Sequence, residues 1–209
     1  MKLQTFVKNL KENWSQQWWD FLLTLAQNKL NWLSISENPN LTWKIILNNP
    51  DKPWAWHRLS AHPNISLDII EKNPDQFYDD FYLSRNKNIT LEYVLSHPEK
   101  NWNWASLSMN TGITMQDVLD NPDLPWVWNN MSFHPNLTLE VLAEHLEEYW
   151  FWDYLSLHQN VTFDFIQQHL DLPWNWNNVS KNPNVTLEMI LSTPDLSWTA
   201  TGRAMNPNI

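Results

Sequence analysis

Residues 175–198 read NWNNVSKNPNVTLEMILSTPDLSW, and this pattern of 24 residues recurs without insertion or deletion along most of the chain. The seven complete repeats span residues 31–54, 55–78, 79–102, 103–126, 127–150, 151–174 and 175–198. Residues 199–209 match the start of an eighth repeat, and residues 1–30 fall outside the pattern. Tandem repetition at such a period is typical of a solenoid, in which each repeat buries its apolar face against its neighbours.

Each repeat carries the start and stop signals of one short α-helix. A Thr or Ser such as Thr138 directly precedes an apolar-periodic run, here LEVLAEHL at residues 139–146. Its hydroxyl can accept a hydrogen bond from an unpaired amide of the first helical turn. In five of the seven repeats a Pro such as Pro122 follows the run, where it interrupts the backbone hydrogen-bond ladder. We therefore expect a helix of about two turns in every repeat.

A second, shorter element follows in the stretch PWVWNNMS, residues 125–132, and in its counterparts. An isolated helix of this length is not stable in water, so we expect one or two α or 3₁₀ turns that neighbouring repeats stabilise. An aliphatic column lies three residues after a tryptophan column, so both can face one core. The aliphatic column is Ile35, Leu59, Leu83, Leu107, Met131, Leu155 and Val179, and the tryptophan column is Trp32, Trp56, Trp104, Trp128, Trp152 and Trp176.

Two polar columns lie in the connection between these elements. A Ser column runs from Ser36 to Ser180, and we expect it to hydrogen-bond the connecting backbone. The other column combines Asn with Gly112, the two residue types that best tolerate a left-handed backbone, so we predict positive φ there. Its members are Asn40, Asn64, Asn88, Gly112, Asn136, Asn160, Asn184 and Asn208.

The order of these features is NPN, hydroxyl cap, short apolar helix, Pro-Asp, second short helix and next NPN, and it resembles the leucine-rich variant repeats. The resemblance covers the chain from Trp32 to Ile209. It implies repeats that pair an α-helix with a 3₁₀ helix in a right-handed superhelix. The second helix departs from that family's usual Val-Arg and Ala, because it holds Trp and Asn, as in WNWNNVS at residues 174–180.

The PW-x-W and NPNIT-like motifs look more like the tryptophan-rich tandem repeats of giant DNA virus proteins. This second resemblance implies a viral origin and brings no known activity with it. Together the residues and the resemblance predict an all-α fold, a right-handed α-solenoid in one continuous domain. Residues 1–30 would form an N-terminal helical cap, residues 31–198 the seven repeats and residues 199–209 a partial eighth repeat.

The net charge of −10 is concentrated in repeats four to six. Residues 101–180 contain no Lys or Arg and ten acids: Asp117, Asp120, Asp123, Glu140, Glu144, Glu147, Glu148, Asp153, Asp164 and Asp171. Such a surface repels phosphate backbones and attracts cations, so we expect a basic protein or peptide as partner and no nucleic acid. The chain has no cysteine and no continuous apolar span, so we expect no membrane partner and a location in host cytoplasm or a virus particle.

The sequence offers no catalytic, metal or cofactor site. His62, His134 and His158 share a column with Asn residues, and His97, His145 and His169 share another, which indicates interchangeable structural hydrogen bonds. Asn cannot replace a general base or an ordinary metal ligand. Only His57 lies outside these columns. We expect a protein that is not an enzyme.

The position after the Ser column is the most informative candidate site. It holds charged residues in other repeats, which indicates exposure, but Met109, Phe133 and Leu157 occupy it in three consecutive repeats. An exposed apolar strip with acids around it is typical of an interaction site, although local packing would also explain it. We predict partner contacts from Met109, Phe133 and Leu157 and from the acids Glu140, Glu144 and Asp153.

An alternative is a glycan-binding ladder built from a second aromatic column. This column lies two residues before the first tryptophan column, on the opposite side of a helix, and we therefore expect it to be the more exposed of the two. Its members are Trp54, Tyr78, Trp102, Trp126, Trp150, Trp174 and Trp198, with Trp102, Trp126, Trp150 and Trp174 as the stacking residues. A third possibility is a structural particle component that self-associates.

Overall fold

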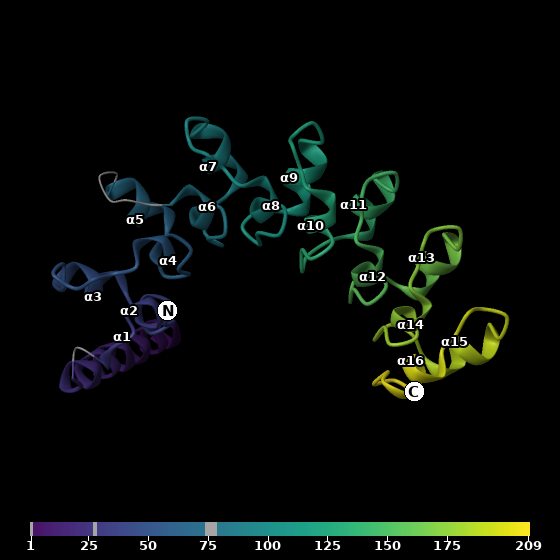
Figure 1. Cartoon of the computed structure of the whole chain (residues 1–209), viewed down its shortest axis with the longest axis horizontal. Helices are drawn as coiled ribbons and strands as arrows, with labels where there is room; N and C mark the ends of the chain where they lie inside the picture. The colour runs from purple at the N-terminus through teal and green to yellow at the C-terminus, as the bar shows by residue number, and fades with distance from the viewer. Residues whose placement is uncertain (1, 27–28, 74–78) are drawn as a thin grey trace. The chain divides into compact units, whose positions relative to one another are not determined.

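The computed structural model describes residues 2–26, 29–73 and 79–209. Throughout these residues the secondary structure is helical, without strands (Figure 1). The chain begins with the long helix α1 (Lys2–Thr24). The helices of four or five residues are α2 (Trp32–Ser36), α4 (Trp56–Ser60), α6 (Asp80–Leu83), α8 (Trp104–Leu107), α10 (Trp128–Met131), α12 (Trp152–Leu155), α14 (Trp176–Val179) and α16 (Ala200–Ala204). The helices of six residues are α3 (Trp43–Asn48), α5 (Leu67–Lys72), α7 (Leu91–Ser96), α9 (Met115–Asp120), α11 (Leu139–Glu144), α13 (Phe163–Gln168) and α15 (Leu187–Ser192).

These helices form two compact units, one up to Asn103 and the other from Trp104 onward. In the first unit α2, α4 and α6 pack in succession, and in the second unit α8 packs on α10 and α14 on α16. The six-residue helices form a second row in each unit (Figure 1). The alternation repeats every 24 residues, so the prediction of an all-α repeat solenoid is confirmed.

The six-residue helices start and stop where the sequence signals predict. Thr138 Oγ1 accepts a hydrogen bond from the Val141 amide at 3.3 Å and so caps α11. Thr114 forms a full capping box, because the Asp117 carboxylate also accepts a bond from the Thr114 amide at 2.7 Å. After α9 the backbone of Asn121 leaves the helical region, with φ −135° and ψ 58°, directly before Pro122.

Buried polar side chains join successive repeats. Ser108 Oγ donates to the Trp104 carbonyl at 2.8 Å and accepts from the amide of Val127, in the next repeat, at 2.9 Å. Ser132 makes the same pair of bonds with Trp128 and Phe151. The Ser column therefore bonds the connecting backbone, as predicted, and it satisfies an amide that would otherwise be buried without a partner.

The prediction of positive φ at the Asn and Gly112 column is wrong, since no residue in the described ranges has a left-handed backbone. The column uses its side chains instead. Asn88 Nδ2 donates to the carbonyls of Pro63 and Ile65, both at 3.0 Å, and Asn160 Nδ2 bonds the Leu137 carbonyl at 2.8 Å. At these positions Asn therefore acts as a side-chain donor that connects neighbouring repeats, a bond that Gly112 cannot make.

Candidate functional site

The apolar strip, which we define as Met109, Phe133 and Leu157, is held at the surface by its neighbours in sequence. Each strip residue follows a Ser that is fully buried and precedes a buried Asn or His. For Phe133 these neighbours are Ser132, whose Oγ bonds the next repeat, and His134, whose ring bonds the preceding one. With both neighbours fixed inward, the side chain between them faces solvent, and all three strip residues are 37% exposed, which confirms the predicted exposure.

The fold does not require apolar residues at the strip position. The same position holds Glu37 in the first repeat, where its carboxylate lies 2.8 Å from Arg58 Nη1, and Arg85 in the third. It holds Lys181 in the seventh. Because charged residues occupy this position elsewhere in the same architecture, its apolar character in three consecutive repeats calls for an explanation other than stability.

Two aromatic residues that the sequence analysis missed extend the strip. The Phe133 ring lies 4.5 Å from the Tyr154 ring and 5.4 Å from the Phe151 ring, and both of these residues are exposed to a similar degree. Asn130 Nδ2 lies 3.8 Å from Met109 Sδ and 3.1 Å from the Ala105 carbonyl. The sequence does contain a signal for Phe151, because the equivalent position in the other repeats holds Asn, Asp, Ala, Val or Thr and no other aromatic residue.

The predicted acids divide between the two rows of helices. Asp153 lies on α12 beside Tyr154 and is exposed, and its Oδ1 accepts a bond from Asn175 Nδ2 at 2.7 Å. Glu140 and Glu144 lie on α11, in the other row (Figure 1). The structure therefore places Asp153 next to the aromatic extension of the strip, whereas Glu140 and Glu144 contribute charge from a different helix.

The charge around the strip is not neutralised within this part of the chain. Over the described ranges, every ion pair joins residues between Lys8 and Lys100. The ten acids of residues 101–180 have no Lys or Arg beside them in that segment, and three of them, Asp117, Asp120 and Asp153, accept hydrogen bonds from neutral neighbours. Unneutralised carboxylates give this surface a negative potential that steers cationic partners toward it.

The expectation that the second aromatic column is exposed is wrong. Trp126, Trp150 and Trp174 are only 6% exposed, and each donates its Nε1–H to a backbone carbonyl, as Trp126 does to Asn121 at 2.9 Å. Trp102 is half-buried and bonds His97 in the same way. Trp54 is also buried, Trp198 is half-buried, and Tyr78 lies outside the described residues.

The physical reason is that the two tryptophan columns do not belong to one helix. Helix α10 begins at Trp128, so Trp126 lies in the extended segment before it. Residues two apart in extended chain point to the same side, not to opposite sides. Both columns therefore face the same interior, where Trp104 and Trp126 meet edge to face with ring centres 5.2 Å apart. The first column is half-buried, and the aliphatic column is buried.

The histidines form structural hydrogen bonds, in the manner of the Asn residues that share their columns. His134 Nδ1 accepts from the Asn136 amide at 3.2 Å, and its Nε2 lies 3.0 Å from the Asn110 carbonyl. Asn86 Nδ2 bonds the preceding repeat from the equivalent position. Burial lowers the pKa of His134, because leaving water disfavours the imidazolium, and burial likewise lowers the pKa of His62 and of His158.

In the part of the chain that the structure describes, no group of three or more His, Asp or Glu side chains is arranged to hold a metal ion. No helix in those ranges has both the length and the apolar character needed to cross a membrane. His57, outside both His columns, packs its ring against Tyr82 at 5.2 Å.

Comparison with family models, with curated proteins and with solved structures finds no match. The resemblance to leucine-rich variant repeats and to viral tryptophan-rich repeats therefore stays a prediction.

Proposed function

We propose that the protein is a non-enzymatic interaction scaffold that binds a basic, partly apolar protein segment through the apolar strip. The observation that carries the proposal is the exposure of Met109, Phe133 and Leu157 at a repeat position that tolerates charge elsewhere. Phe151 and Tyr154 enlarge the apolar surface, and the base-free segment around it supplies negative potential. A virus particle or host cytoplasm is our proposed setting, on the resemblance alone.

The tryptophan ladder does not support a glycan-binding function. Sugar recognition by stacking needs an exposed aromatic face, and Trp126, Trp150 and Trp174 use both their rings and their indole nitrogens inside the fold.

The proposal can be tested with a fluorescein-labelled amphipathic peptide of Lys and Leu. A labelled peptide of Glu and Leu serves as the control of opposite charge. We expect the wild-type chain to raise the anisotropy of the Lys peptide only. The triple variant Met109→Ser, Phe133→Ser, Leu157→Ser should bind about tenfold more weakly or worse, because buried apolar anchors dominate such interfaces. Raising the ionic strength from about 0.15 M to about 1 M should also weaken binding, since the Debye length falls from about 8 Å to about 3 Å.

A matched control removes three apolar residues that are more exposed than the strip residues but lie outside the strip. Leu47, Leu95 and Leu191 are exposed on α3, α7 and α15. The variant Leu47→Ser, Leu95→Ser, Leu191→Ser should bind the Lys peptide as the wild type does. Equal losses in both triple variants, or equal affinity for both peptides, would show that the strip is not a specific site.

A further inference from the structure

Helix α1 exposes an apolar stripe that its own repeats do not cover. Its anchor to the first unit is Trp19, which is 3% exposed and whose ring packs 5.5 Å from Trp54 and 6.4 Å from Trp32. Ahead of the buried Ser15, the side chains of residues 4–14 are all exposed. They include Phe6, Val7, Leu10 and Trp14, which recur at the three- and four-residue spacing of one helix face.

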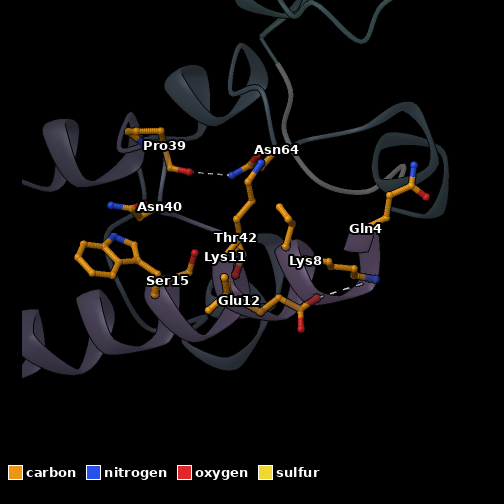
Figure 2. A pocket seen from close by; sticks show the side chains of 12 residues that line it. Gln4, Lys8, Lys11, Glu12, Ser15, Pro39, Asn40, Thr42 and Asn64 are labelled. Atoms are coloured by element: carbon orange, nitrogen blue, oxygen red, sulfur yellow. Dashed lines mark hydrogen bonds and ion pairs between the residues drawn. The ribbon is translucent and has the colours of Figure 1, made fainter. Parts of the chain in front are cut away.

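Part of this stripe forms one wall of a cavity of about 1090 Å³, which we call the α1 groove. Val7, Leu10 and Trp14 line the α1 side, and the opposite wall is formed by the connecting turns around Pro39 and Asn64. Figure 2 shows the two walls, with Asn64 bonded to the Pro39 carbonyl on one side and the Lys and Glu side chains of α1 on the other. The groove is open, and its helical wall is apolar.

The groove also carries positive charge. Lys8 and Lys11 line it together with Glu12, and Lys8 Nζ lies 3.9 Å from a Glu12 carboxylate oxygen. Within the described ranges Lys11 has no acidic side chain within ion-pair distance. The α1 groove is therefore a basic, partly apolar helical surface, which is the chemistry expected of the partner of the apolar strip.

We infer that the partner of the strip is the α1 groove of a second copy of this chain. The inference rests on the proposed function of the strip. Charge complementarity supports it: residues 101–180 have ten acids and no Lys or Arg, and the negative potential of that segment would attract Lys11, which has no acidic side chain within ion-pair distance in the described ranges. The stripe from Phe6 to Trp14 spans about 12 Å of helix, and strip residues on neighbouring repeats are about 10 Å apart, so the stripe can cover two of the three strip residues at once.

Such a contact joins two different surfaces, so it closes into a two-fold dimer only where both groove-to-strip contacts can form between the same two copies. Where they cannot, each copy uses its groove for one neighbour and its strip for another, and a head-to-tail interface of this kind builds open chains unless its rotation closes a ring. The assembly would weaken with salt, since its charges lie at the protein surface.

The test uses two variants of the full chain, each disabled at one surface. The groove variant is Leu10→Ser, Lys11→Glu, Trp14→Ser, and the strip variant is Met109→Ser, Phe133→Ser, Leu157→Ser. All six side chains are exposed, so both variants should keep the circular dichroism spectrum and melting temperature of the wild type. Sedimentation velocity should show wild-type species that grow with concentration, whereas each variant alone stays monomeric.

The decisive measurement is an equimolar mixture of the two variants. One intact groove and one intact strip remain, so the mixture should form a one-to-one dimer that does not grow further. A wild type that is monomeric up to about 1 mM, where binding is weaker than any interface we propose, would overturn the inference. So would assembly by either variant alone, or a mixture that stays monomeric.

These outcomes separate the inference from the proposed function. A monomeric wild type that binds the Lys and Leu peptide through the strip would remove the second copy as partner and leave the scaffold function standing. A strip variant that both assembles and binds the peptide as the wild type does would remove both.

Discussion

His158 Nε2 lies 3.1 Å from the backbone oxygen of His134, which occupies the same position 24 residues earlier. Nδ1 of the same ring accepts a hydrogen bond from the Asn160 amide at 3.2 Å, so the neutral ring carries its proton on Nε2 and donates it to His134. Both ring nitrogens are therefore used in the neutral form. A second proton would have to sit on Nδ1, where it would oppose the amide N–H.

This geometry predicts that acid destabilises the fold. Burial lowers the pKa of His62, His134 and His158 below their unfolded value of about 6.5. The unfolded chain then binds more protons, so stability is fully present above about pH 6.5 and is lost as the pH falls from there toward the lower folded pKa values. The melting temperature should therefore fall as the pH is lowered from roughly 7.5 to roughly 5, and thermal melts across this range would measure the change.

The matched variant for this prediction is His62→Asn, His134→Asn, His158→Asn. Asn86 and Asn182 occupy the same column, and their side-chain amides already donate hydrogen bonds to the preceding repeat. Carboxylates titrate equally in both proteins, so the difference between the two pH profiles isolates the histidines. The variant should lose less stability on acidification. Parallel profiles would mean that protonation of the buried rings does not limit stability.

Removing one hydroxyl of the Ser column should be costly. Ser132→Ala deletes the acceptor of the Phe151 amide, at 2.9 Å, and leaves that amide without its partner. We expect a loss of about 1–3 kcal/mol in the free energy of unfolding, the cost of an unsatisfied buried donor. Urea unfolding measures it, with Ser192→Ala as control, because Ser192 is exposed and only bonds the Met189 carbonyl. Similar values for both variants would contradict the role assigned to the column.

The sequence predicted the elements well because their signals are local. Hydroxyl caps such as Thr138 and prolines such as Pro122 act within one helical turn, and the structure confirms the helices that they delimit. The exposure of Met109, Phe133 and Leu157 was also predictable, because charged residues at the same position in other repeats indicate that the position faces solvent.

Predictions failed where a residue's role depends on the next repeat. The Asn and Gly112 column suggested a backbone explanation, but the Asn88 amide bonds carbonyls of the preceding repeat, a contact that spacing within one repeat cannot reveal. The Trp126 column was misplaced because helix α10 begins only at Trp128, so Trp126 lies in the extended segment before the helix. The contact of Phe133 with Tyr154 likewise joins neighbouring repeats, so a single repeat contains no sign of it.

Gly202 marks a close approach between α14 and α16. A Cβ added there would overlap Ser180 Cβ and would lie 2.6 Å from the Asn177 carbonyl oxygen and 2.7 Å from Thr199 Oγ1. Alanine gains up to about 1 kcal/mol of helix propensity over glycine, whereas overpacking against backbone costs about 1–3 kcal/mol, so Gly202→Ala should be destabilising. Hydrogen exchange should show faster exchange confined to α14 through α16. Gly112→Ala is the control, since its φ is not positive and alanine should be tolerated.

Two substitutions that lie two residues apart can distinguish the role of the strip in binding from the role of the core in stability. Met131 is fully buried, so Met131→Ala should cost about 2–5 kcal/mol through lost burial and a cavity. Phe133 is 37% exposed and packs its ring against Phe151 and Tyr154, so Phe133→Ser should cost about 1 kcal/mol or less yet weaken binding of the Lys and Leu peptide about tenfold. Calorimetry and peptide anisotropy on the same samples make the comparison. If Phe133→Ser unfolds the repeat as Met131→Ala does, the apolar residues of the strip are structural, and the binding argument loses its main observation.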